Sequence, residues 1–224
     1  MLGVVGPNGS GKTTLFRAVC GDVRPTAGKV VWDGREITGW STDRIARAGL
    51  VRTWQQSMVF GSVSVRENLR MAIACAPRVA AGRPDLPVKV EHMLGFTGLT
   101  PVATIPAASL PTGLLRIVGI ALALITRPLM LMLDEPAAGL NPAEAERLSD
   151  LLRRVHDAGA ALTVVDHDMS FILPLCERLI VLDAGKKLIE GDSAEVVRHE
   201  DVVRVYLGAR FAHGKAGTAA VVAE

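Results

Sequence analysis

The sequence predicts an α/β layered fold with a largely parallel sheet, and three observations predict it. Short apolar runs of strand length recur along the chain, helix-compatible segments separate them, and glycine-rich or acidic residues follow several runs. The runs 129–133 and 161–165 are almost wholly apolar, as expected for strands buried on both faces of a parallel sheet. Hydrophobic residues make up 49% of the 224 residues and charged residues 21%, which excludes a disordered chain.

The first predicted elements are a strand, a glycine-rich loop and a helix. Residues 1–5 are the strand, and residues 12–20 are helix-compatible as far as Gly21, a suitable C-terminal cap. The elements expected next are strands at 29–32 and 50–54, with a short helix at 42–48 between them.

The middle of the chain is predicted to be mostly helical. Ser64 and Glu67 have the spacing of a capping box, so a helix should begin at Val65 and reach about Cys75. The Ala-, Pro- and Gly-rich segment 76–87 predicts a mobile connector. Residues 113–126 are apolar nearly all round, which predicts a helix buried on most faces.

The C-terminal half alternates strands and helices again. Asn141 and Pro142 suit the N-cap and first turn of a helix that reaches about Asp157. The small and polar residues 209–224 predict a disordered tail. A hairpin is expected where two apolar runs flank an Asp-Ala-Gly-Lys turn, at 179–182 and 187–189.

Charge and composition exclude several function classes. The formal charge of +2, spread along the chain, does not favour a nucleic-acid partner. Arg127 and Pro128 interrupt the most apolar stretch and leave about half of a membrane span, and the N-terminus has no signal-peptide pattern. A cytosolic location is therefore expected, with any membrane reached through a partner. The cysteines lack metal-ligand spacing and predict reduced core thiols: Cys20, Cys75 and Cys176.

The strongest chemical signal is a glycine-rich run that satisfies G-x-x-x-x-G-K-[ST] between a strand and a helix N-terminus. Its glycines let backbone N–H groups turn toward phosphate oxygens, and the helix dipole adds positive potential. Lys12 is expected to reach the β- and γ-phosphates of ATP, and the Thr13 hydroxyl to bind Mg²⁺. The context disfavours the alternative, a glycine turn with an exposed lysine. The expected nucleotide-binding residues are Gly6, Pro7, Asn8, Gly9, Ser10, Gly11, Lys12, Thr13 and Thr14.

Two carboxylates follow the apolar strand 129–133, at the end where ligands bind in open α/β sheets. Asp134 is placed to bind Mg²⁺, directly or through water. Glu135 is expected to polarise an attacking water as general base. Alone, the pair could equally be two solvated carboxylates; together with the phosphate-binding loop, the catalytic interpretation is favoured.

Two further polar residues are candidates for the same site. His167 follows the strand 161–165 and should emerge on the same sheet edge as Glu135, where it could contact the γ-phosphate or hold the water. Gln55 follows the strand 50–54 and could ligate Mg²⁺ and respond to the γ-phosphate. The alternatives are a structural histidine and an ordinary surface glutamine.

In their order along the chain, these motifs resemble those of an ABC-type ATPase. The resemblance extends from Leu2 to about Gly208 and rests on the phosphate-binding loop, Gln55, the turn 110–113 opening an apolar helix, 134–136, 138–141 and His167. More narrowly, four segments are similar to the ATP-binding subunit of branched-chain amino acid importers: 52–55, 134–142, 166–169 and 205–208.

The resemblance implies a P-loop NTPase fold in one domain, 1–208, with a helical signature subdomain at about 65–125. It also implies a head-to-tail dimer in which the catalytic residues of one chain face the turn near Gly113 of a second ABC ATPase subunit across ATP. The other implied partners are transmembrane permease subunits, docking beside the segment after Gln55, and indirectly an extracytoplasmic solute-binding protein. The location implied is cytoplasmic, peripheral on the inner face of the cell membrane.

The sequence departs from the family pattern at two places. The signature turn has Pro111 where relatives have serine and Leu114 where they have glutamine, so a weaker γ-phosphate clamp is expected. Relatives also have several strands before the loop, with an aromatic residue that stacks on adenine. Only residues 1–5 precede Gly6 here, so we expect these N-terminal strands to be missing.

Three other functions are weighed against an importer ATPase. A soluble ABC ATPase acting on nucleic acid or the ribosome usually has two P-loops or a long coiled insertion, and neither is present. The signature departures favour a catalytically weak partner in a heterodimer, although Glu135 and His167 argue against full silence. A small-molecule kinase would not need Gln55, the signature turn and His167 together.

Overall fold

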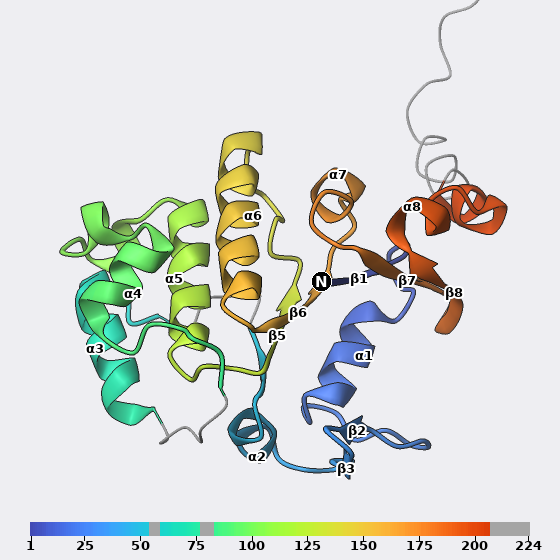
Figure 1. Cartoon of the computed structure of the whole chain (residues 1–224), viewed down its shortest axis with the longest axis horizontal. Helices are drawn as coiled ribbons and strands as arrows, with labels where there is room; N and C mark the ends of the chain where they lie inside the picture. Colours follow the sequence, from blue (N-terminus) through green and yellow to red (C-terminus); the bar gives the residue numbers. More distant parts are fainter. Residues whose placement is uncertain (54–58, 77–82, 207–224) are drawn as a thin grey trace, which may run out of the picture.

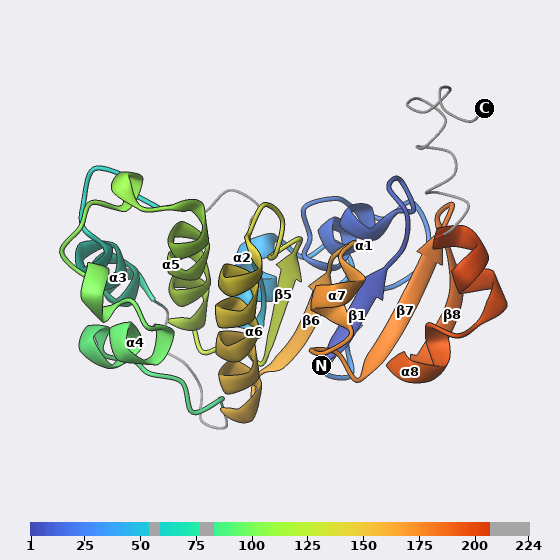
Figure 2. The same cartoon turned by 90° about the horizontal axis from the view of Figure 1, so that it is seen from above.

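The computed structural model describes residues 1–53, 59–76 and 83–206. Within these ranges the main sheet has six strands in the order β4-β5-β6-β1-β7-β8 (Figures 1 and 2), and only the β7–β8 pair is antiparallel. The predicted α/β fold with a mostly parallel sheet is therefore confirmed. The strands are β1 (Leu2–Val5), β4 (Leu50–Arg52), β5 (Met130–Asp134), β6 (Ala161–Val165), β7 (Arg178–Asp183) and β8 (Lys186–Asp192).

Alternate residues of the strands enter two different hydrophobic clusters, one on each face of the sheet. Val5, Leu133 and Val164 belong to the larger cluster, while their neighbours Val4 and Met132 belong to the smaller one. In Figure 1 the helices α6 and α7 cover one face, and α1 and α2 cover the other. These helices are α1 (Lys12–Val19), α2 (Thr42–Arg47), α6 (Pro142–Asp157) and α7 (Met169–Ile172).

Three helices pack together at one end of the molecule, beside α6 (Figures 1 and 2). The predicted capping box at the start of α3 is present, because Ser64 Oγ accepts from Glu67 N (3.2 Å) and Glu67 Oε2 accepts from Ser64 N (3.0 Å). None of the helices in the described ranges is long and apolar enough to cross a membrane. The three are α3 (Val65–Cys75), α4 (Val90–Thr97) and α5 (Thr112–Leu124).

Several predicted boundaries differ from the observed ones. The strand expected at 29–32 is a two-stranded hairpin of β2 (Val31–Trp32) and β3 (Arg35–Glu36), with Asp33 and Gly34 at its turn. Helix α4 was not predicted, because its eight residues carry only a weak periodic pattern, although Met93 and Leu94 are fully buried. A short helix α8 (Ser193–Val196) follows β8.

The predicted connector 76–87 is anchored in its described part. The Arg83 guanidinium donates to Arg47 O (2.8 Å), and Asp85 N donates to Ala158 O (2.9 Å). These bonds tie the segment to two helices of the sheet region. The predicted tail 209–224 lies outside the described residues.

Candidate nucleotide-binding site

The loop after β1 has a shape that only glycine allows at its first position. Gly6 has φ +152°, and a Cβ there would lie 2.1 Å from Leu182 O and 2.7 Å from Ser10 Oγ. Gly9 and Gly11 also have positive φ, at +79° and +98°. Residues 6–11 thus curl closely against β7 before the chain enters α1.

Lys12 lies buried inside this loop. Its ammonium group donates to Gly6 O (2.8 Å), Pro7 O (2.9 Å) and Ser10 Oγ (3.4 Å). Burial lowers the pKa of Lys12, and the carboxylates of Glu135, Asp134 and Asp166 oppose that shift. The three carboxylates at the ends of β5 and β6 therefore favour the charged form of Lys12.

The N-terminus of α1 is well suited to an anion. Its N-cap is Gly11, which provides no side-chain acceptor, and its first turn carries no acidic residue. The first backbone N–H groups of the helix and its dipole therefore face the loop without a capping carboxylate. Gly185 N donates to Ser10 O (3.1 Å), so the β7–β8 turn also holds the loop.

Asp134 ends β5 and is 1% exposed. Its Oδ2 accepts from the Arg52 guanidinium at 2.6 Å, while its Oδ1 is buried and has no hydrogen-bond partner among the described residues. A buried oxygen without a partner is costly unless it has a ligand. Because Mg²⁺ takes oxygen ligands, this carboxylate beside the phosphate-binding loop fits the ion.

Glu135 has a strained backbone, as residues at functional sites often do. Its φ is +47°, in the left-handed region that residues other than glycine rarely adopt, and its N–H donates to Val165 O at 2.8 Å. The Arg116 guanidinium, on α5, donates to Glu135 O and to Ala138 O, each at 3.3 Å. The backbone on both sides of the catalytic candidate is thus held in place.

Asp166 organises the turn that carries His167. One carboxylate oxygen accepts from His167 N (2.8 Å) and Asp168 N (3.1 Å), and the other accepts from Ala137 N (3.2 Å). The His167 side chain is 57% exposed, with Nδ1 at 3.6 Å from Asp166 Oδ1. His167 therefore lies at the predicted sheet edge, open to a ligand.

Of the other two predicted site residues, one cannot be placed and the other, Gly113, does not lie at this edge. Gln55 lies outside the described residues. Gly113 is buried in the first turn of α5, where a Cβ would lie 2.6 Å from Glu144 Oε1. Helices α5 and α1 are separated by β5 and β6 in Figure 2, so the signature turn is not part of the same chain's phosphate-binding loop.

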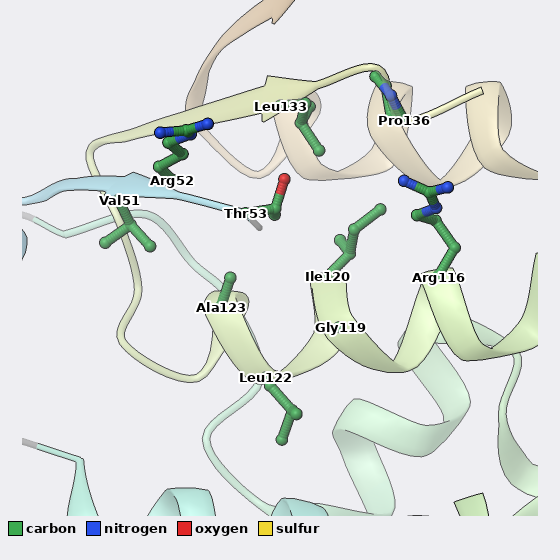
Figure 3. Close-up of a pocket in the computed structure, with 10 residues that line it drawn as sticks. All are labelled: Val51, Arg52, Thr53, Arg116, Gly119, Ile120, Leu122, Ala123, Leu133 and Pro136. Atoms are coloured by element: carbon green, nitrogen blue, oxygen red, sulfur yellow. The ribbon is translucent and has the colours of Figure 1, made fainter. Parts of the chain in front are cut away.

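Three residues of the site were missed by the sequence interpretation, namely Arg52, Arg116 and Asp166. Arg52 and Arg116 approach a cavity of about 160 Å³ from opposite sides (Figure 3). A signal existed in each case, because a charged side chain next to a buried strand or within an apolar helix needs a partner. The other labelled residues lining this cavity are Val51, Thr53, Gly119, Ile120, Leu122, Ala123, Leu133 and Pro136.

Comparisons with known proteins agree with this geometry. A family model described as ABC transporter matches residues 1–138. The branched-chain amino acid transport ATP-binding protein BraF of Pseudomonas aeruginosa is 33% identical over 93% of this chain and 87% of its own length. LivG of Escherichia coli, described in the same words, is 32% identical with the same coverage.

Solved structures give the same answer. The ADP conformation of MJ1267, an ATP-binding cassette of an ABC transporter, has a TM-score of 0.81 and 27% identity over 93% of this chain and 87% of that chain. A nucleotide-free ATP-binding cassette from an ABC transporter has a TM-score of 0.79 and 26% identity. The phosphate-binding loop, the two carboxylates and these relatives together show that the chain belongs to the ABC transporter family of ATPases.

Proposed function

We propose that this chain binds Mg²⁺-ATP and that its hydrolysis energises a membrane importer for branched-chain or related amino acids. The observation that carries the proposal is that the phosphate-binding loop with its buried Lys12 follows β1 at the same sheet edge where Asp134 and Glu135 follow the parallel strand β5. The solute class rests on the descriptions of BraF and LivG. Their descriptions name transport, not nucleic-acid binding, so they favour the importer over the soluble alternative.

Each residue then has a role. The N–H groups of residues 6–14 and the Lys12 ammonium hold the phosphates. Thr13, Asp134 and Gln55 would hold Mg²⁺, which neutralises charge on the β- and γ-phosphate oxygens when bound. Glu135 accepts the proton of the attacking water, and His167 orients that water or the γ-phosphate.

The complete site needs a second subunit. Because α5 and α1 are separated within one chain, the turn at Gly113 would reach a γ-phosphate only across a dimer interface. Pro111 and Thr112, the exposed residues of that turn, would face the partner's ATP, and Pro111 has no hydroxyl to contribute. A head-to-tail pair of ABC ATPase subunits follows from this arrangement, with the helical subdomain at about 65–125 presenting the turn.

The remaining partners are transmembrane permease subunits and, through them, an extracytoplasmic solute-binding protein. In this arrangement the chain is cytoplasmic and peripheral on the inner face of the cell membrane. Closure of the dimer on ATP would move the permease, and opening after hydrolysis would reset it.

The transport assignment is tested by reconstitution. The chain is co-expressed with the permease subunits and solute-binding protein of a branched-chain amino acid importer, and the complex is placed in phospholipid vesicles. Leucine-loaded binding protein should stimulate ATP hydrolysis and drive leucine uptake, whereas the same protein presented with arginine should do neither. An ATP hydrolysis rate that does not change when leucine, isoleucine or valine is supplied with the binding protein would contradict the proposed solute class.

A further inference from the structure

Arg52 is buried between two carboxylates, and the proposed function assigns it no role. Its guanidinium donates to Asp134 Oδ2 at 2.6 Å and to Asp22 Oδ2 at 2.8 Å. The exposed fractions of the three side chains are 8%, 0% and 11% for Arg52, Asp134 and Asp22. One cation thus joins two anions from different parts of the chain, and Figure 3 shows the Arg52 side chain lying between β4 and β5.

Stability alone is a weak reason for such a group. The free energy needed to remove the charges from water is about as large as the free energy gained from their attraction. Well-packed apolar residues in the same place often give equal stability. Arginine differs from lysine because its guanidinium group is planar, which fixes the direction of each hydrogen bond that it donates. A buried arginine between two carboxylates therefore specifies geometry more than it adds stability.

The geometry specified here is the rotation of the Asp134 carboxylate. With Oδ2 bound to Arg52, the carboxylate plane is fixed and Oδ1, which has no partner among the described residues, is presented as the available acceptor. Charge-assisted bonds of this length are among the stronger ones in proteins. Without Arg52, either oxygen could turn toward a ligand, and the orientation would be lost.

Asp22 holds Arg52 from the other side. Asp22 follows α1, and its N–H donates to Arg17 O at 2.8 Å. Asp22 is therefore fixed to the C-terminal end of α1, the helix that follows the phosphate-binding loop. Its second oxygen accepts from Thr42 Oγ1 at 3.4 Å. The guanidinium thereby connects the phosphate-binding helix to the strand that carries Asp134.

We propose that Arg52 is a positioning residue that orients Asp134 toward the Mg²⁺ of bound Mg²⁺-ATP, and that Asp22 keeps Arg52 in that position. This inference rests on the proposed function, because it takes Asp134 as the residue that holds the ion. Arg52 touches neither nucleotide nor metal in this scheme. Lysine in its place would keep the charge but could not bridge both carboxylates with fixed directions.

The test measures metal dependence, not only turnover. The affinity for a fluorescent ATP analogue is titrated against free Mg²⁺ and in EDTA, and Mn²⁺ binding to the nucleotide complex is followed by electron paramagnetic resonance. Arg52→Gln should raise the half-saturating Mg²⁺ concentration about 10- to 100-fold, the range for partners of metal-binding side chains, with EDTA affinity unchanged. Arg52→Lys and Asp22→Asn should shift it less, in the same direction.

Two reference variants separate the possible failures. Arg47→Gln removes an exposed arginine paired with Asp43 and should leave the titration as in wild type. Asp134→Asn should shift the Mg²⁺ midpoint at least as far as Arg52→Gln does. If Asp134→Asn has no effect, the metal assignment of the proposed function is wrong.

If Asp134→Asn shifts the midpoint but Arg52→Gln does not, the proposed function stands and the inference about Arg52 is wrong. An equal loss of affinity with and without Mg²⁺ in Arg52→Gln would also overturn it, because that is the result of a merely structural role. Should Arg52→Gln fail to fold, as judged by its thermal transition, the same comparison is made with Arg52→Lys and Asp22→Asn. Wild-type midpoints in both would then refute the proposal.

Discussion

Gly6→Ala is a direct test of the phosphate-binding loop. The added Cβ would lie 2.1 Å from Leu182 O, a backbone atom of β7, and 2.7 Å from Ser10 Oγ. The serine hydroxyl can rotate away, but the carbonyl belongs to a strand paired on both sides. Relief to an ordinary contact of at least 3.4 Å requires the loop to move by more than about 1 Å, because a packed sheet leaves no free space for the added atom.

A displacement of about 1 Å in a site that depends on positioning costs about 100-fold in rate. We therefore expect Gly6→Ala to lower kcat/KM for ATP by about 100-fold. The strained backbone should also lower the free energy of unfolding by about 1–3 kcal/mol. Steady-state ATP hydrolysis and chemical denaturation measure the two effects.

Gly9→Ala is the matched control within the same loop. Gly9 also has positive φ (+79°), but no atom lies within 4 Å of a Cβ built there. Its substitution should add left-handed strain of about 1–2 kcal/mol without displacing the loop. If Gly6→Ala retains wild-type kcat/KM, or if both variants lose it equally, the steric reasoning is wrong.

The remaining predictions concern the supports of the site. Arg116→Met removes two donors to backbone carbonyls beside Glu135 and should lower kcat about 10-fold with little change in KM for ATP; an unchanged kcat would refute this role. Asp166→Asn leaves one N–H without its acceptor and should cost about 1–3 kcal/mol in denaturation; wild-type stability would contradict it. Cys75 is exposed, so the prediction of three core thiols is wrong for this residue, and Ellman's reagent should label it rapidly at pH 8. Burial raises the pKa of Cys20 to about 12 and of Cys176 to about 11, so both stay protonated, and rapid labelling of all three would contradict the fold.

Local signals predicted several elements to the residue. The capping box at Ser64 set the start of α3, and Asn141 with Pro142 set the start of α6, because each cap acts within four residues of sequence. The run Ala161–Val165 was identified as a strand because it is short, β-branched and apolar except for Thr163. Such elements depend on neighbouring residues alone.

Features that depend on distant residues were not predictable in the same way. Arg52 and Asp134 are 82 residues apart in the sequence, and only the parallel pairing of β4 with β5 brings them together. The family resemblance drew attention to Gly113 as a ligand-facing glycine, but its packing against Glu144 shows that it also has a structural reason to lack a side chain. Contacts between residues so far apart in the sequence can be predicted only once the fold is known.

The central claim is that Glu135 activates water for hydrolysis of ATP held by the phosphate-binding loop, and Glu135→Gln tests it most directly. This substitution keeps the shape and removes the base, so ATP binding should be retained, hydrolysis should fall at least about 100-fold, and an ATP-bound dimer should accumulate on size-exclusion chromatography. Glu146→Gln, an exposed glutamate of α6, is the matched control and should hydrolyse ATP normally. Wild-type hydrolysis by Glu135→Gln would contradict the claim.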